Sequence, residues 1–299
     1  MSAYLIGLDL GGSSVKAAAL KPSGEILDTC QREFDVNRPR HWAETVQECF
    51  ENFRDQYGPD LQSIGLSAPG IPDSAGQSIA HMPGRLEGLE NLNWANYLNW
   101  AKPLPVLNDA QAALLGETWL GAAKGQKNVV MITLGTGVGG AALLDGHLLR
   151  GQFGRGGHLG HICLGIDEKP DICGTPGSLE LMIGNCSIET RTQGRFKTTF
   201  ELLQAVRSGS PEAKRIWDKS VKALACGIAS LINILDPQTV ILGGGIARAG
   251  EQLMDPLRSY LDQFEWRPGG RRSELKIATL GEWAGAYGAA KHGLIKSEV

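Results

Sequence analysis

The sequence predicts an α/β protein built of two similar lobes with a cleft between them. One supersecondary pattern occurs twice, once near the N-terminus and once near the middle of the chain. Each copy reads as strand, tight glycine loop, strand, turn and strand. Forty glycines among 299 residues is nearly twice the average usage of about 7%, and they cluster in loops. Clustered glycines indicate backbone that comes close to ligands.

The repeated pattern is visible directly in the residues, and even the Ala-Ala-Leu after each glycine loop recurs. Two copies of one unit, each opening a half of the chain, predict the two lobes. The first copy consists of the apolar run 4–8, the loop Asp9-Leu-Gly-Gly-Ser-Ser14, the run 15–20, the turn 21–24 and the run 25–27. The second consists of the run 129–134, the loop Gly135-Thr-Gly-Val-Gly-Gly140, the run 141–144, the turn 145–146 and the run 147–149.

Other elements follow from periodicity. Trp42, Val46, Cys49, Phe50 and Phe53 fall at helical spacing and predict a helix with one buried face. The remaining expected elements are a buried strand at 63–68, a long helix at 212–235 that Asp236-Pro237 ends, a strand at 239–242, a helix beginning at Ile246, and a Gly- and Ala-rich helix at 282–296 that returns to the first lobe.

Asn108 and Asp109 stand between an apolar run (Leu104, Val106, Leu107) and an expected helix at 110–124. A carboxylate at the carboxyl end of a strand is where open α/β sheets place their ligands, and it is held by rigid elements on both sides. Asp109 is therefore a candidate catalytic base. The alternative is that both residues only cap the helix, as Asn and Asp often do.

The two glycine loops have the features that a triphosphate needs. Glycine lets backbone N–H groups approach phosphate oxygens, and the Asp9 carboxylate can hold Mg²⁺ directly or through water. The alternative is a pair of tight turns without ligands. A P-loop motif does not occur in the sequence. Gly135, Gly137 and Gly140 match the dinucleotide fingerprint, but a strand and not a helix follows them.

Composition limits the class of partner. The net charge of −3 gives no basic surface for nucleic acid, and no window of 18 apolar residues predicts a membrane span. The N-terminus has no basic region before its first apolar residues, unlike a signal peptide, so we expect a cytoplasmic protein. The six cysteines are dispersed without a CxxC pair, which is typical of reduced thiols.

Four motifs in this order and spacing resemble the ROK family of sugar kinases: Asp9-x-Gly-Gly-Ser13, Asn108-Asp-Ala110, Leu134-Gly-Thr-Gly-Val-Gly-Gly140 and Gly243-Gly-Gly245. The resemblance covers nearly the whole chain. It implies the two-lobed actin-like ATPase (ribonuclease H-like) fold with a central cleft. It places a small lobe at 1–112 plus 284–299 and a large lobe at 113–283, and it implies a homodimer.

The resemblance also implies roles for individual residues, with ATP and Mg²⁺ as cofactors. Asp109 would take the proton from the sugar hydroxyl, and Asn108, Gly70, His161 and Glu180 would contact the sugar. The phosphates would be held by Asp9, Gly11, Gly12 and Ser13 of the first loop and by Gly135, Thr136, Gly137, Gly139 and Gly140 of the second, with Gly243, Gly244 and Gly245 supporting the adenosine.

Two positions depart from the family pattern. His158 stands where the family has a glutamate that binds sugar hydroxyls, so we expect His158 in the sugar site with altered preference. In a segment that binds structural zinc in the family, the four ligand positions are His161, Asp171, Cys173 and Ser178. Because serine is a poor zinc ligand and structural sites prefer thiolates, we expect no zinc here.

The leading hypothesis is ATP-dependent phosphorylation of a hexose or amino-hexose at a primary hydroxyl. A second keeps the fold but takes polyphosphate as donor, because the form Gly-Gly-Ser-x-x-Lys ending at Lys16 is similar to polyphosphate-dependent glucokinases. A third is a sugar-binding regulatory protein without catalysis. Repressors of the family carry an N-terminal helix-turn-helix, for which the first strand at about Tyr4 leaves no room, and Asp109 argues for catalysis.

Overall fold

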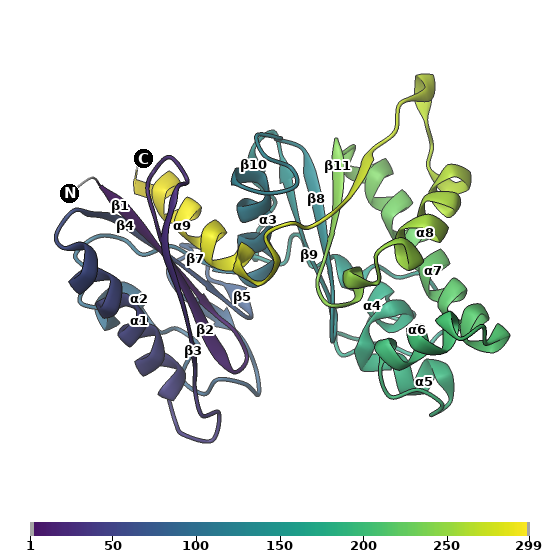
Figure 1. Ribbon diagram of the computed structural model, residues 1–299, viewed down its shortest axis with the longest axis horizontal. Helices are drawn as coiled ribbons and strands as arrows, with labels where there is room; N and C mark the ends of the chain where they lie inside the picture. Colours follow the sequence, from purple (N-terminus) through teal and green to yellow (C-terminus); the bar gives the residue numbers. More distant parts are fainter. Residues whose placement is uncertain (1–2, 298–299) are drawn as a thin grey trace. The chain divides into compact units, whose positions relative to one another are not determined.

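The computed structural model describes residues 3–297. The chain divides into two compact units, and each is described here by itself (Figure 1). The first unit comprises Met1–Gly125, Leu149–Gly156 and Thr279–Val299, and the second comprises Gln126–Leu148 and Gly157–Ala278. The expected boundary at residue 112 differs from this division, because it would cut the helix α3 (Asp109–Trp119) in two. Residues 1–2 and 298–299 of the expected small lobe lie outside the described residues.

The first unit is built on a five-stranded sheet in the order β3-β2-β1-β4-β7. The first three strands along the chain form an antiparallel meander, and β4 and β7 then run parallel to β1. The strands are β1 (Tyr4–Leu10), β2 (Ser14–Leu20), β3 (Ile26–Glu33), β4 (Leu61–Ala68) and β7 (Val106–Asn108).

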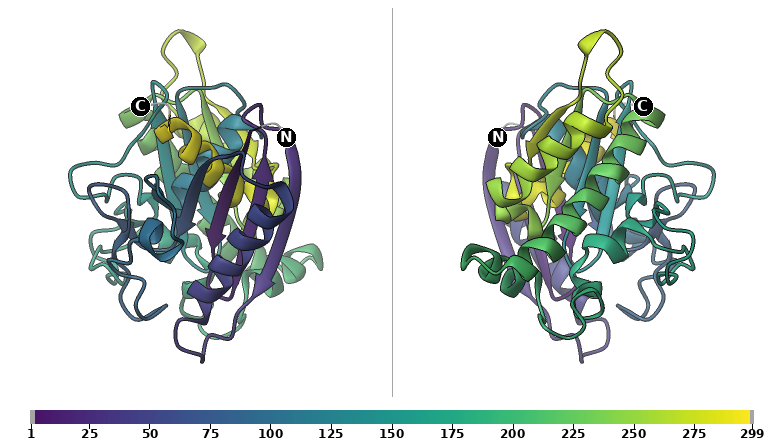
Figure 2. Two further views of the ribbon diagram at one scale, coloured as in Figure 1. Left: turned by 90° about the vertical axis from the view of Figure 1, so that its left-hand side faces the viewer. Right: turned by 90° about the vertical axis from the view of Figure 1, so that its right-hand side faces the viewer.

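Helices cover opposite faces of this sheet. Tyr4, Ile6 and Leu8 pack with the buried side chains of α1 (His41–Tyr57), whereas Leu5 packs with those of α9 (Ala284–Ser297). Because side chains alternate along a strand, α1 and α9 lie on the two sides, as the left view of Figure 2 shows. A side chain at Gly7 would overlap the backbone of α9, so glycine permits this close packing.

The second unit repeats the plan. Its five-stranded sheet has the order β10-β9-β8-β11-β12, again with an antiparallel meander followed by two parallel strands. The strands are β8 (Val129–Leu134), β9 (Val138–Leu144), β10 (His147–Leu148), β11 (Thr239–Gly243) and β12 (Glu274–Ile277). Its helices are α4 (Leu179–Ile183), α5 (Ile188–Thr192), α6 (Thr199–Arg207), α7 (Pro211–Leu235) and α8 (Glu251–Phe264).

The predicted internal repeat is confirmed strand by strand, because β1, β2, β3, β4 and β7 correspond in order and direction to β8, β9, β10, β11 and β12. Two helix predictions need correction. The helix expected at 110–124 ends at Trp119, and Leu120 caps it. Residues 246–249 form only a short 3-10 turn, because Gly250 adopts φ +59° before α8 begins.

The sequence did not predict several short elements. They are β5 (Ile71–Pro72), β6 (Ile79–His81), α2 (Trp94–Tyr97), the helices α4, α5 and α6, and the edge strand β12. Within residues 3–297, the helices are all too short or too polar to cross a membrane.

Candidate functional site

Most of the predicted site residues of the first unit follow the carboxyl ends of parallel strands. Asp9 stands near the end of β1, the loop 11–13 joins β1 to β2, Gly70 follows β4, and Asn108 ends β7. Because β1, β4 and β7 are parallel neighbours, these three positions share one edge of the sheet. This is the edge at which open α/β sheets bind ligands.

The first glycine loop is a tight turn with exposed backbone. The Gly11 nitrogen donates to the Ser14 carbonyl at 2.9 Å, and Gly12 and Ser13 are exposed. A Cβ atom at Gly12 would lie 2.8 Å from a guanidinium nitrogen of Arg85. The structure thus places a positively charged side chain, that of Arg85, beside the predicted phosphate loop. Arg85 was not predicted, because it stands in an irregular loop without a motif.

Asp9 is the last but one residue of β1 and is partly buried. The pKa of Asp9 is raised to about 6: burial is the main cause and the negative charge of Asp109 adds to it, while a hydrogen bond from Ser67 and the charge of Lys16 act to lower it. Lys16 lies opposite Asp9 on β2, with its Nζ atom 3.4 Å from Glu282 Oε2. A cation bound at Asp9 would relieve the cost of ionising this carboxylate.

Asn108 and Asp109 have different roles at the start of α3. Asn108 is the N-cap residue: its Oδ1 accepts from the Ala110 nitrogen at 3.0 Å, and its Nδ2 donates to the Gly70 carbonyl at 2.9 Å. Gly70 has φ +104°, and a Cβ there would lie 2.7 Å from the His81 carbonyl oxygen. Asn108 is therefore the capping residue, although Asp109 Oδ1 also accepts from the Ala110 nitrogen, at 2.7 Å. Asp109 is the first helical residue, and its side chain is exposed.

The second glycine loop joins β8 to β9 and is held by Glu180. The Gly135 nitrogen donates to the Gly137 carbonyl at 2.9 Å, and Glu180 Oε2 accepts from the Val138 nitrogen at 2.9 Å. A side chain at Gly137 would overlap this carboxylate. Glu180 was predicted to contact sugar, and the structure shows that one of its oxygens supports the loop.

Gly139 and Gly140 do not belong to the loop itself. They lie within β9, paired with Thr133 and Ile132 of β8. Gly140 is buried, and a Cβ there would lie 2.7 Å from the Leu159 side chain. Their backbone groups therefore form the sheet, and the exposed turn is limited to 135–137.

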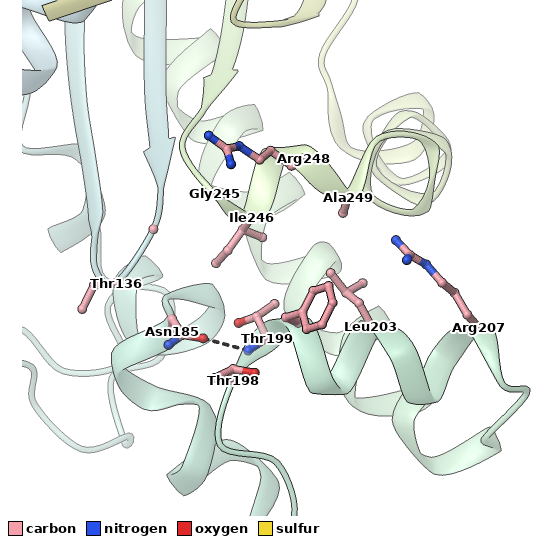
Figure 3. A pocket seen from close by; sticks show the side chains of 12 residues that line it. Thr136, Asn185, Thr198, Thr199, Leu203, Arg207, Gly245, Ile246, Arg248 and Ala249 are labelled. Atoms are coloured by element: carbon pink, nitrogen blue, oxygen red, sulfur yellow. Dashed lines mark hydrogen bonds between the residues drawn. The ribbon is translucent and has the colours of Figure 1, made fainter. Parts of the chain in front are cut away.

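A cavity of about 630 Å³ opens beside the second loop (Figure 3). It lies at the carboxyl ends of β8 and β11, where Gly244 adopts φ +84° and a Cβ would overlap the Leu134 carbonyl. Gly243 is buried in β11, and Gly245 reaches the cavity. The lining residues are Gly135, Thr136, Asn185, Thr198, Thr199, Phe200, Leu203, Arg207, Gly245, Ile246, Arg248 and Ala249.

One buried hydroxyl group in the cavity wall lacks a hydrogen-bond partner among the described residues. Thr199 is 3% exposed, and its Oγ1 atom has no hydrogen-bond partner within the described part of the chain. Its backbone nitrogen donates to Asn185 Oδ1 at 2.7 Å, as Figure 3 shows. Asn185 in turn donates from its nitrogen to the Gly135 carbonyl at 3.0 Å. A buried hydroxyl without a partner is costly, and this one belongs to a residue of the cavity wall.

Sequence reasoning missed most of this cavity wall. The available signal was Thr198-Thr-Phe-Glu201, which has the form of a capping box, and Thr198 does cap α6 by accepting from the Glu201 nitrogen at 3.1 Å. That signal predicts a helix start but says nothing of a ligand.

The residues at the expected zinc positions lie together in the second unit. His161 Nδ1 is 2.7 Å from Asp171 Oδ2, and Cys173 Sγ is 3.5 Å from His161 Nε2. Although burial acts to raise it, hydrogen bonds from His161 and Ser178 lower the pKa of Asp171 to about 2. His158 precedes the 3-10 turn Leu159–His161 and is partly buried.

Comparisons with known proteins agree with this arrangement. The ROK family matches residues 5–295. A glucokinase of Thermotoga maritima is 32% identical over 99% of this chain and 98% of its own length. An N-acetylmannosamine kinase of Haemophilus influenzae (strain PittEE) is 30% identical over 95% of this chain and 93% of its own.

Solved structures confirm the expected actin-like ATPase fold. A ROK hexokinase of Thermus thermophilus has a TM-score of 0.88 and 30% identity over 99% of both chains. A ROK family glucokinase of Streptomyces griseus, in complex with glucose and AMPPNP, has a TM-score of 0.78 and 25% identity over 98% of this chain and 100% of its own.

Proposed function

The chain belongs to the ROK family, and on this premise we propose that it is a sugar kinase that transfers the γ-phosphoryl group of ATP to the primary hydroxyl of a hexose or amino-hexose. The observation that carries the proposal is the position of Asp109. It stands at the N-terminus of α3, on the sheet edge that also bears the first glycine loop. Its charge acts on Asp9 of that loop.

The proposed chemistry needs a base and positioning rather than covalent help. Asp109 accepts the proton of the sugar hydroxyl while that oxygen bonds to the γ-phosphorus and the bond to the β-phosphate oxygen breaks. Asn108, Gly70, His158, His161 and Glu180 are proposed sugar contacts. Asn108 uses one amide hydrogen on the Gly70 carbonyl, which leaves the second for a sugar hydroxyl.

Mg²⁺ fits the first loop. Asp9 offers a hard oxygen ligand, and the burial that raises its pKa would be offset by a bound cation, which supports this role. Bound there, Mg²⁺ would neutralise phosphate charge. Lys16 and Arg85 add positive charge in the same unit, and Arg85 lies against Gly12, where the loop backbone is exposed.

The cavity favours ATP over polyphosphate as donor. A nucleotide has a base that can fill an apolar space and hydrogen bond to the orphaned Thr199 hydroxyl, and Phe200 and Ile246 supply apolar surface. Polyphosphate has no base and needs a row of cations. The cavity offers two arginines, Arg207 and Arg248, and both are exposed.

The proposal is tested by measuring product formation over a panel of hexoses, with ATP and with polyphosphate. We expect ADP release with a hexose or amino-hexose. Thr199→Val should lower kcat/KM for ATP by roughly 10-fold, since a ligand hydrogen bond in a buried site is lost. Thr29→Val, on β3 of the first unit, is the matched control and should change nothing. Turnover with polyphosphate alone would make the donor assignment wrong. Sugar binding without turnover by either donor would favour the regulatory protein.

We also propose a homodimer, as the family resemblance implies. Light scattering during size-exclusion chromatography should give twice the chain mass of 32.0 kDa, and a single-chain mass at working concentration would contradict it.

A further inference from the structure

His161, Asp171, Cys173 and Ser178 occupy the positions that bind structural zinc in the family that the sequence resembles. In this chain, the His161, Asp171 and Cys173 side chains offer ligand atoms that all lie within 4.8 Å of one another. Proximity alone does not distinguish a metal site from a hydrogen-bonded cluster. The distances between individual atoms make this distinction.

The contact between His161 and Asp171 is a direct hydrogen bond. The Nδ1 and Oδ2 atoms are 2.7 Å apart. Two ligands on one tetrahedral zinc, each at about 2.0 Å from the ion, would be separated by about 3.3 Å. The observed distance leaves no place for an ion between these atoms. The imidazole therefore donates from Nδ1 to the carboxylate.

The other atoms cannot complete a zinc site. The Asp171 Oδ1 atom accepts from the nitrogens of Cys173 at 2.9 Å and Thr175 at 3.0 Å. Ser178 is fully buried, and its Oγ caps α4 by accepting from the Leu181 nitrogen at 3.4 Å. Only His161 Nε2 and Cys173 Sγ remain as ligands, and structural zinc takes four.

The Asp171 carboxylate is instead the centre of a hydrogen-bond network. Its side chain is inaccessible to solvent, and its two oxygens join the imidazole of His161 to the turn that contains Cys173 and Thr175. A buried carboxylate that accepts from an imidazole, two backbone nitrogens and the Ser178 side chain is well satisfied, and charge-assisted bonds of this kind are the strong ones. The network therefore ties two separate segments together, as a metal ion would.

We propose that Asp171 replaces the structural metal in this chain: its carboxylate, and not zinc, holds His161 and the turn 171–175 in place. For the sugar-binding role of His161 the inference rests on the proposed function, in which His161 contacts the sugar. Asp171 is then a positioning residue. It keeps the imidazole in one orientation and one tautomer through the bond at Nδ1.

The first test needs no substrate. The purified chain should hold less than about 0.1 zinc per chain, and neither chelator nor added zinc should change its melting temperature. In the double variant Asp171→Cys with Ser178→Cys, three thiolates and His161 form a full ligand set. That variant should bind one zinc per chain and melt lower in chelator. One tightly held zinc in the unaltered chain, with a chelator-sensitive melting temperature, would overturn the proposal.

The second test uses Asp171→Asn, which keeps the shape but not the charge. We expect a lower melting temperature and a rise of about 10-fold in KM for the sugar, with kcat and the KM for ATP little changed. The matched control is Asp167→Asn on a neighbouring exposed loop, which should match the unaltered chain. Equal melting temperatures and sugar KM values for both variants would show that Asp171 does not hold His161 and the turn 171–175 in place.

Rescue separates positioning from a general loss of stability. The zinc-loaded double variant should recover the sugar KM, and chelator should remove that recovery. If no sugar is turned over by any variant, the proposed function fails, but zinc content and melting temperature still decide the inference. If sugar is turned over and the unaltered chain proves to need zinc, the inference alone fails.

Discussion

The carboxylate of Glu117 accepts hydrogen bonds from the backbone nitrogen of Thr279 at 2.9 Å and from its hydroxyl at 3.2 Å. Glu117 is fully buried in α3 and also accepts from the nitrogens of Leu280 at 2.8 Å and Ala122 at 2.7 Å. Thr279 begins the last segment of the first unit, and Ala122 lies three residues before Gly125, where the first segment of that unit ends. One carboxylate therefore fixes both segments to the helix that begins at Asp109.

Glu117→Gln should lower the free energy of unfolding by about 2–4 kcal/mol, because an amide NH₂ would face donors that now bind an oxygen. Urea denaturation followed by fluorescence measures this. Glu87→Gln, at an exposed position, is the control. Equal unfolding midpoints for the two variants would show that the Glu117 network contributes nothing to stability.

Asp109→Asn should abolish turnover while leaving sugar binding largely intact, because asparagine keeps the size but cannot accept the proton. General base catalysis contributes roughly 10²- to 10⁴-fold, so kcat should fall at least that far. Steady-state kinetics and calorimetric sugar binding measure the two effects. Undiminished turnover of the purified variant would remove Asp109 from the mechanism.

The raised pKa of Asp9 predicts an acid limb in the activity. With a pKa of about 6, Asp9 is ionised above this pH and becomes protonated as the pH falls below it. Because a proton and Mg²⁺ compete for the carboxylate, kcat/KM for ATP should fall below about pH 6, and higher Mg²⁺ should move the limb to lower pH. If the pH at which kcat/KM falls does not change with Mg²⁺ concentration, Asp9 does not bind the metal.

His158→Glu should change the ranking of sugars. A neutral imidazole offers one acceptor and one donor, whereas a carboxylate accepts through two oxygens, so the favoured hydroxyl pattern differs. A buried polar group left unpaired by the wrong sugar can cost up to roughly 10⁴-fold, and partial solvation reduces this. We expect the unaltered chain to prefer a sugar other than plain glucose.

The measurement is kcat/KM for glucose and for the best sugar of the panel, in the unaltered chain and in His158→Glu. Efficient use of glucose by the unaltered chain, with the same ranking of sugars in the variant, would show that His158 does not determine specificity.

His292, buried in α9, should make stability depend on pH. The pKa of His292 is lowered to about 3, mainly by burial and in smaller part by the charges of Lys296 and Arg150. Between about pH 6.5 and 3 the unfolded chain binds this proton and the folded chain does not. The free energy of unfolding should therefore fall as the pH decreases through this window, by up to about 1.4 kcal/mol per pH unit.

Urea denaturation at a series of pH values checks this effect. Relative to the unaltered chain, His292→Gln should become progressively more stable as the pH falls from 6.5 to 4. His147→Gln, at an exposed position on β10, should show no such trend. A difference between the His292 variant and the unaltered chain that stays constant with pH would contradict the assigned pKa.

The sequence by itself determined the repeat, the two glycine loops and the place of Asp109 between a strand and a helix. These features are local: a strand shows in a short apolar run, a helix in its period, and a tight turn in its glycines. The buried face of α1 was predicted for the same reason, since Trp42, Val46 and Phe53 recur at helical spacing. The predicted helix boundaries near residues 120 and 246 were wrong, because the position of a helix end depends on tertiary packing.

Only the tertiary structure decided which distant residues meet. Glu117 and Thr279 are 162 positions apart, and Asn108 binds the carbonyl of Gly70, 38 positions away. Arg85 lies against Gly12 although no motif links them. The cavity beside the second loop draws residues from 135 to 249. Such contacts depend on how helices and strands pack. The local sequence around a buried polar group does not identify its hydrogen-bond partner.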